Sequence, residues 1–216
     1  VLQMAVSSLG TFYNLEVSPE KVKGKKYNKD YFMNTSAALI GSLGSVVAAW
    51  HRIRNDKEPI ASNQDSTYAE NFLLMLGAEN ITPLMTRIMD ATLVLHGEHT
   101  INASTFTAMV TSSTLANASQ VVASAIGSLS GPLHGGANEK VVSMLSKIDS
   151  KDDIRPWLDD TLKAKNVVWG MGHREYSVKD PRANILTEMV QELFNEREGG
   201  VTDIFEKAIE LEKACE

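Results

Sequence analysis

The sequence is short of cysteine and of basic charge. Cys215 is its single cysteine among 216 residues, so no internal disulfide forms and a reducing compartment is the simplest expectation. Lys and Arg number 21 against 27 Asp and Glu, which gives a formal net charge of -6. Because no basic surplus neutralises phosphates, this composition argues against a nucleic-acid-binding protein. A small anion needs only a few local cations and stays a candidate ligand.

Sequence signals for membranes and secretion are also not expected. We find no apolar run that approaches the roughly 20 residues of a transmembrane helix, so no membrane partner is predicted. Residues 1–14 lack the basic start and cleavage site of a signal peptide. We therefore expect a cytoplasmic protein, with the mitochondrial matrix as the alternative. A helix is already under way at Val1 without an N-cap, so we expect a segment of a longer chain.

Strand patterns are absent, whereas helical periodicity recurs along the chain, so the predicted fold class is all-α. Thr82-Pro83 and Asn102 are typical helix starts, and Gly77 is a typical helix end. Small residues such as Gly41, Gly44 and Ala48 favour close helix packing. We expect helices at 1–13, 30–53, 68–76, 83–95, 103–115, 119–129, 153–163, 183–197 and 202–214, and one from the His134 turn to Lys147.

His134 lies in the glycine-rich stretch Ser130–Glu139, at the expected start of a helix. Backbone N–H groups and the dipole at a helix start oppose a positive charge, so the imidazole is expected to be a neutral hydrogen-bond donor. Such a donor suits a developing enolate oxygen. Gly135 and Gly136 permit unusual backbone angles and close approach of a ligand. The alternative is a loop histidine without a chemical role.

Residues 166–182 form a second stretch with candidate site residues, which contains His173 and Asp180-Pro181-Arg182. Proline stiffens the approach to a helix and holds the guanidinium of Arg182 close to His173. An arginine fork binds a carboxylate through two parallel hydrogen bonds. Together with His99 and His134, these residues predict a pocket for a polycarboxylate anion. A surface ion pair is the alternative for the arginine alone.

The sequence lacks the motifs of a metal site, a serine hydrolase and a dinucleotide-binding site. His96 and His99 lie three residues apart, but no His-Glu-x-x-His pattern and no nearby cysteine accompany them, so no metal site is predicted. A serine hydrolase is not favoured because no Gly-x-Ser-x-Gly elbow is present. Gly170-Met171-Gly172 lacks the third glycine and the βαβ frame of a dinucleotide site.

Three ordered motifs resemble those of the citrate synthase family. They are His96–Thr105, Gly131–Glu139 and Gly170–Tyr176, the last followed by Asp180-Pro181-Arg182. The resemblance covers nearly all of the chain. It implies a citrate-synthase-like helical bundle, with a large domain over residues 1–133 and a mainly small domain over residues 134–216.

The resemblance implies an acyltransferase that condenses acetyl-CoA with oxaloacetate and water to citrate and CoA, the first step of the tricarboxylic acid cycle. By position, His134 matches the histidine that hydrogen-bonds the thioester oxygen, and His173 matches the one that polarises the oxaloacetate carbonyl. His99 and Arg182 match ligands of its carboxylates. The family needs no metal and no permanently bound cofactor, and a homodimer or higher homo-oligomer is implied.

The chain departs from the family pattern in three respects. Ser177 stands where relatives commonly have Lys or Arg near the CoA phosphates, and Arg174 or Lys179 is the candidate substitute. The family's catalytic aspartate and further arginines find no match before Glu216, since Asp203 lies in a helix start. We therefore expect the segment to be inactive alone. The alternatives are a 2-methylcitrate synthase using propionyl-CoA and a non-catalytic oligomeric scaffold built through helices 37–49 and 119–129.

Overall fold

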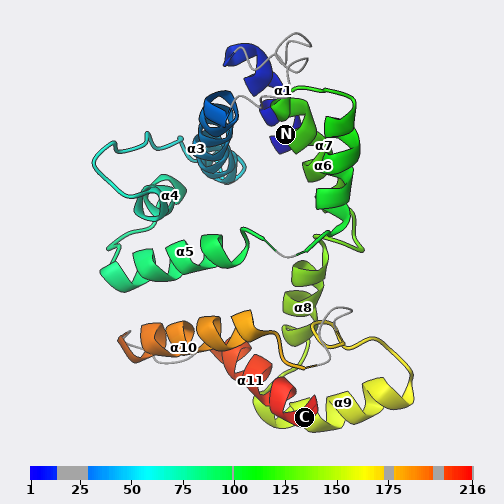
Figure 1. Cartoon of the computed structure of the whole chain (residues 1–216). Coiled ribbons are helices and arrows are strands. Elements are labelled where there is room, and N and C mark those ends of the chain that lie inside the picture. Colours follow the sequence, from blue (N-terminus) through cyan, green and yellow to red (C-terminus); the bar gives the residue numbers. More distant parts are fainter. Residues whose placement is uncertain (14–28, 99, 173–177, 197–201, 216) are drawn as a thin grey trace. The chain divides into compact units, whose positions relative to one another are not determined.

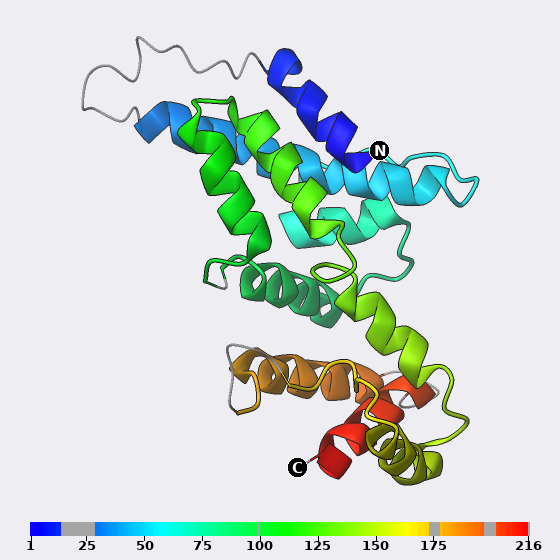
Figure 2. The same cartoon turned by 90° about the vertical axis from the view of Figure 1, so that its right-hand side faces the viewer.

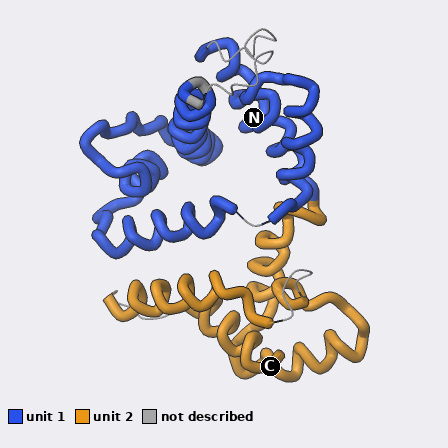
Figure 3. The backbone as a smooth tube through the Cα atoms, viewed as in Figure 1, with its two compact units in different colours: residues 1–131 blue, residues 132–216 orange. Residues whose placement is uncertain are grey.

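The computed structural model describes residues 1–13, 29–98, 100–172, 178–196 and 202–215, and within these ranges all regular structure is helical (Figure 1). The all-α prediction is confirmed. The chain forms two compact units, Val1–Gly131 and Pro132–Glu216 (Figure 3). Their boundary lies close to the division predicted after residue 133, and their assignment as a large and a small domain stays a prediction.

The first unit contains six described helices. They are α1 (Leu2–Phe12), α3 (Lys29–Ile53), α4 (Tyr68–Leu76), α5 (Pro83–Leu95), α6 (Ala103–Ser113) and α7 (Ala118–Leu129). Helix α7 packs against α1 and α6, and α4 packs against α3 and α5 (Figure 2). The crossing of α1 and α7 is close because Gly10 of α1 faces Ser119 of α7.

The three capping signals predicted in this unit are confirmed, whereas α6 ends at Ser113 and not at residue 115 as predicted. The Thr82 hydroxyl accepts a hydrogen bond from the Met85 N–H at 3.2 Å, and Pro83 is the first residue of α5. The Asn102 carboxamide accepts one from the Thr105 N–H at 2.9 Å at the start of α6. Gly77 ends α4 with φ of 89°, in the left-handed region that favours glycine.

The small residues of α3 are used for packing along part of its length. Ala48 is fully buried, and a Cβ on Gly44 would lie 2.8 Å from the Tyr68 hydroxyl of α4. That hydroxyl donates a hydrogen bond to the Ile40 carbonyl at 2.8 Å. Gly41, in contrast, has open space where its side chain would be. The predicted close packing therefore holds at Gly44 and Ala48 but not at Gly41.

Helix α3 also corrects the statement that no apolar run approaches the length of a membrane span. Phe32–Ile53 has 22 residues and a mean hydropathy of 1.4, which is long and apolar enough to cross a membrane. The reason is that no charged residue occurs between Phe32 and Trp50, so the glycines and polar side chains of this stretch do not lower its mean hydropathy enough. Length and composition alone do not distinguish such a span from a packed helix of a globular unit.

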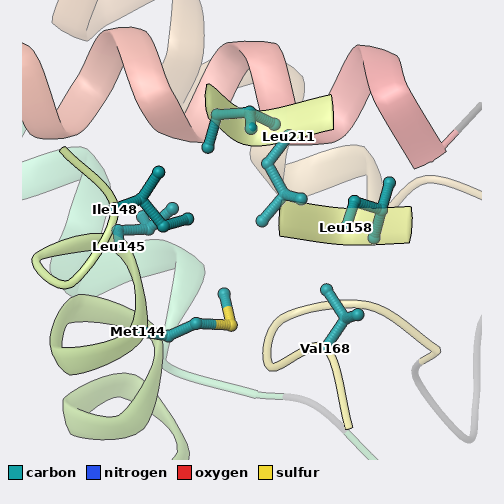
Figure 4. Close-up of a cluster of buried hydrophobic side chains, with 7 residues drawn as sticks. Met144, Leu145, Ile148, Leu158, Val168 and Leu211 are labelled. Carbon is teal, nitrogen blue, oxygen red and sulfur yellow. The ribbon is translucent and has the colours of Figure 1, made fainter. Parts of the chain in front are cut away.

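The second unit consists of α8 (Ala137–Leu145), a 3₁₀ turn (Lys151–Asp153), α9 (Ile154–Lys163), α10 (Pro181–Glu196) and α11 (Asp203–Cys215). A cluster of buried apolar side chains in this unit comes from α8, the turn after α8, α9, the loop after α9 and α11 (Figure 4). It comprises Met144, Leu145, Ile148, Ile154, Leu158, Val168 and Leu211. Helix α8 is shorter than predicted, because it ends at Leu145 and not at Lys147.

Candidate functional site

His134 lies in a turn between two helices and is half-buried. Helix α7 ends at Leu129, residues 132–136 form the turn, and α8 begins at Ala137 after its N-cap Gly136. Gly136 has φ of -77°, so the unusual backbone angle expected there is not found. A Cβ at this glycine would instead lie 3.0 Å from the Cα of Pro132. The glycine is thus needed for close packing within the turn that presents His134.

Arg182 lies in the first turn of α10, beside Asp180. The Arg182 Nε donates to both Asp180 carboxylate oxygens at 3.1 Å, and its Nη2 donates to Oδ2 at 2.6 Å. The Arg182 backbone N–H donates to Asp180 Oδ1 at 2.9 Å. Both side chains are half-buried, with 28% and 27% of their surface exposed. The carboxylate therefore holds both the backbone and the guanidinium of Arg182.

The segment that precedes His173 in the sequence is fixed against α8. Gly170 and Gly172 have φ of 94° and 76°, both in the left-handed region that side chains disfavour. The Met171 N–H donates to the Val168 carbonyl at 3.3 Å, which closes a turn. The ammonium of Lys140 in α8 lies 4.0 Å from the ring centre of Trp169, a cation–π contact.

Lys179, a candidate for the CoA phosphates, forms an ion pair with another helix. Its Nζ lies 2.7 Å from Oε1 of Glu212 in α11, and both side chains are about one-third exposed. Nothing in the sequence pattern pointed to Glu212 or to the contact of Lys140 with Trp169. Each pair joins residues far apart in the chain, and no short motif records such a contact.

Three of the predicted site residues, His99, His173 and Arg174, lie outside the described residues. The structure places His134, Lys179 and Arg182 in the second unit. His96 lies at the end of α5, where its Nδ1 is 2.7 Å from the Thr92 carbonyl. In the described part of the chain, no group of three or more His, Cys, Asp or Glu side chains is arranged to hold a metal ion.

The family model described as "Citrate synthase, C-terminal domain" matches residues 1–216. The chain belongs to the citrate synthase family. Citrate synthase of Acidithiobacillus ferridurans is 41% identical over 213 residues, which cover 99% of this chain and 54% of that protein. Citrate synthase of Synechocystis sp. is 42% identical over 215 residues, 100% of this chain and 52% of that protein. The chain therefore spans about half the length of these citrate synthases.

Solved citrate synthases share the fold. The crystal structure of citrate synthase from Pyrobaculum aerophilum matches with a TM-score of 0.84 at 30% identity, over 99% of this chain and 53% of that one. The Thermoplasma acidophilum enzyme, solved as a ternary complex with carboxymethyl coenzyme A and oxaloacetate, matches with a TM-score of 0.78 at 26% identity, over 98% and 53%. A further relative, "Citrate/2-methylcitrate synthase" of Bacillus subtilis, is 40% identical over 156 residues, 72% of this chain and 42% of that protein. These matches confirm the citrate-synthase-like fold and the resemblance drawn from the three motifs.

Proposed function

We propose that the protein acts as a citrate synthase, which condenses acetyl-CoA with oxaloacetate and water and releases citrate and CoA. The observation that carries this proposal is the match to citrate synthases over 99% and 100% of the chain, which includes the segments around His134 and Arg182. The Thermoplasma acidophilum relative was solved with oxaloacetate and a CoA derivative. The substrates of the proposed reaction are of the same two kinds.

Each assigned side chain has one task in this reaction. The imidazole of His134 donates a hydrogen bond to the thioester oxygen while the family's aspartate base, which has no match among residues 1–216, takes a proton from the methyl carbon and negative charge develops on that oxygen. His173 polarises the ketone of oxaloacetate, whose carbon then forms the new carbon–carbon bond. Arg182 and His99 hold the carboxylates, and Arg174 or Lys179 the CoA phosphates. Water finally hydrolyses the thioester and sets CoA free.

Acetyl-CoA enters this scheme as a co-substrate, and no step of the scheme calls for a metal ion. The held guanidinium of Arg182 supports the anion-binding part of the proposal. Asp180 contacts it through Nε and Nη2, and a guanidinium carries five N–H donors in a planar fork. Such a fork recognises a carboxylate through two parallel hydrogen bonds.

We propose further that the protein assembles as a homodimer or higher homo-oligomer. Helix α6 exposes Phe106, Met109 and Val110, with 61%, 51% and 52% of their surface accessible. These residues lie three and four positions apart and share one helix face, as in apolar subunit interfaces. Light scattering on the full-length protein tests this, and a monomeric mass at micromolar concentration contradicts it.

A second acyl substrate has specific support. The Bacillus subtilis relative named for both citrate and 2-methylcitrate synthesis favours propionyl-CoA as the alternative donor. One methylene group is worth only about 1–3 kcal/mol of discrimination in an apolar pocket. Steady-state rates with acetyl-CoA and propionyl-CoA, compared as kcat/KM, decide between the two donors.

The proposal is tested by the release of free CoA, detected with a thiol reagent, from acetyl-CoA and oxaloacetate and the full-length protein. His134→Ala should lower kcat by about 10²–10³-fold, the loss typical of a removed oxyanion donor. Calorimetry should show that oxaloacetate still binds to this variant. His51→Ala, at an exposed histidine near the end of α3, is the matched control and should keep wild-type turnover. Absence of CoA release by the wild type, or near-normal turnover of His134→Ala, contradicts the assignment.

A further inference from the structure

Two contacts join α8 to the loop after α9. The ammonium of Lys140 lies 4.0 Å from the ring centre of Trp169, and both residues are half-buried. The negative face of an indole ring attracts such a cation, and partial burial strengthens the attraction. Beside this contact, a Cβ built on Gly170 would lie 3.3 Å from Cγ2 of Val141. The loop therefore lies directly against α8.

The same loop is anchored in the core of the second unit. Val168 is 9% exposed and belongs to the buried cluster that includes Met144 of α8 (Figure 4). Gly170 has φ of 94°, a backbone conformation that side chains disfavour. Its glycine is thus needed both for the backbone angle and for the close approach to α8. Together these features fix the backbone of residues 168–170.

This docked loop lies between the two histidines of the proposed reaction in the sequence. His134 lies in the turn before α8, and Lys140 is in the same helix. Trp169 precedes His173 by four residues. Lys140 and Trp169 have no task of their own in the proposed reaction, yet their contact joins the helix that follows the first histidine to the loop that leads to the second.

We propose that Lys140 and Trp169 are positioning residues, whose contact holds the loop after α9 against α8 in the conformation that binds oxaloacetate. The inference rests on the proposed function, because it takes oxaloacetate as the ligand. Neither residue touches the substrate. Without the contact the docked loop is only partly populated, and the apparent affinity for oxaloacetate falls by the docked fraction. Saturating oxaloacetate restores the docked state, so kcat is kept.

Three variants and one control separate positioning from a direct role of the lysine charge. Lys140→Met keeps a long side chain but removes the ammonium, whereas Lys140→Arg keeps a cation that can lie over the ring. Trp169→Leu removes the ring and leaves the ammonium in place. The matched control is Lys147→Met, which makes the same change of charge at an exposed lysine in the turn after α8.

Steady-state kinetics of CoA release by the full-length protein give KM for oxaloacetate and kcat. We expect Lys140→Met and Trp169→Leu each to raise KM about three- to tenfold, the factor that a half-buried cation–π contact supplies, with kcat changed by less than about threefold. The double variant should raise KM no more than the larger single change, because the two side chains form one contact. Lys140→Arg and Lys147→Met should match the wild type.

Hydrogen exchange gives a readout that does not depend on activity. The Met171 N–H donates to the Val168 carbonyl at 3.3 Å, so its exchange reports the opening of the loop. In the unliganded full-length protein, Lys140→Met and Trp169→Leu should speed this exchange about three- to tenfold, and Lys147→Met should leave it unchanged.

A direct contact of the Lys140 ammonium with an anionic substrate predicts a different pattern. Lys140→Met would then raise KM whereas Trp169→Leu would not, and this result overturns the inference. Additive effects in the double variant overturn it as well, because the two residues would then act separately. Unchanged KM and unchanged exchange, with an active wild type, overturn the inference alone. If the wild type releases no CoA, the proposed function fails and the assignment of oxaloacetate to this loop fails with it.

Discussion

Gly10 lies at the crossing of α1 and α7, and a side chain at this position has no space. A Cβ built on Gly10 overlaps the Oγ of Ser119 and lies 3.3 Å from its Cβ. Ser119 is fully buried, and its hydroxyl is within 2.7 Å of Asn117 Oδ1 and 3.3 Å of the Ser7 carbonyl. Because these bonds fix its rotamer, Ser119 does not move aside at low cost. We therefore expect Gly10→Ala to push the two helices apart.

Two opposing contributions set the size of this effect. Alanine in a helix interior is favoured over glycine by about 0.5–1 kcal/mol. Overpacking of a close contact costs about 1–3 kcal/mol. The difference predicts that Gly10→Ala lowers the free energy of unfolding by up to about 2.5 kcal/mol. For a chain of this length that corresponds to a fall in Tm of up to roughly 10 °C.

Gly41 provides the matched control, because it is also a helical glycine of the first unit. No atom lies within 4 Å of a Cβ built there, so only the helix-propensity term remains. Gly41→Ala should therefore raise the free energy of unfolding by about 0.5–1 kcal/mol. The two substitutions are chemically identical and are expected to shift stability in opposite directions.

Urea denaturation followed by circular dichroism measures both variants, with Tm as a second readout. Ser119→Gly removes the overlapping atoms, so in that background Gly10→Ala should cost less than it does alone by about 1 kcal/mol, the coupling expected of residues in contact. A shift of the same sign for Gly10→Ala and Gly41→Ala refutes the reasoning. Additive effects of Gly10→Ala and Ser119→Gly refute the contact itself.

Two further predictions concern the second unit. Leu211 is 2% exposed in the core, so Leu211→Ala should lower the free energy of unfolding by about 2–5 kcal/mol in urea denaturation. Leu162 is 57% exposed, so Leu162→Ala should lower it by less than about 1 kcal/mol. Equal losses for the two variants contradict the core assignment. Burial raises the pKa of the Cys215 thiol, and the nearby charge of Arg155 partly lowers it. Iodoacetamide should therefore modify Cys215 at pH 8 more slowly in the folded protein than in the urea-unfolded chain. Arg155→Gln should slow the modification of the folded protein further. Since the folded pKa lies above the unfolded one, the thiol's contribution to stability is complete below the unfolded pKa and is lost as pH rises through the folded pKa. An alkylation rate equal to that of the unfolded chain contradicts this pKa shift.

Helix boundaries were predictable where a few neighbouring residues decide them. Thr82 and Asn102 cap their helices through N–H groups three residues ahead, and the left-handed φ of Gly77 is a property of glycine itself. The end of α8 was not predictable in this way. Lys147 and Ile148 make turn-type bonds to residues three positions back, and Ile148 is buried in the core of the second unit. Packing against other helices, which local sequence does not record, decides where α8 ends.

The same distinction applies to the candidate site. Asp180 and Arg182 are two residues apart, so their pairing can be predicted from the Asp-Pro-Arg motif alone. The contacts of Lys179 with Glu212 and of Lys140 with Trp169 depend on how α8, α11 and the loop after α9 are folded together. Sequence reasoning therefore identified candidate chemical groups but not the residues that hold their surroundings in place.

In helices α8 and α10, the proposed ligand-binding residues lie at one end and buried residues lie at the other. His134 precedes the first turn of α8, and Met144 and Leu145 at the other end of that helix are buried in the core. Arg182 lies in the first turn of α10, and Phe194 near its other end is 8% exposed and packs against Phe205 of α11 with ring centres 5.4 Å apart.

At 1.5 Å per residue, the backbone of Phe194 lies about 18 Å along the helix axis from that of Arg182. A substitution at the proposed site therefore changes few contacts of the core, whereas a core truncation leaves the helix starts in place. For this reason we expect Arg182→Gln and Leu211→Ala to have separate effects, the first on KM for oxaloacetate and the second on the free energy of unfolding.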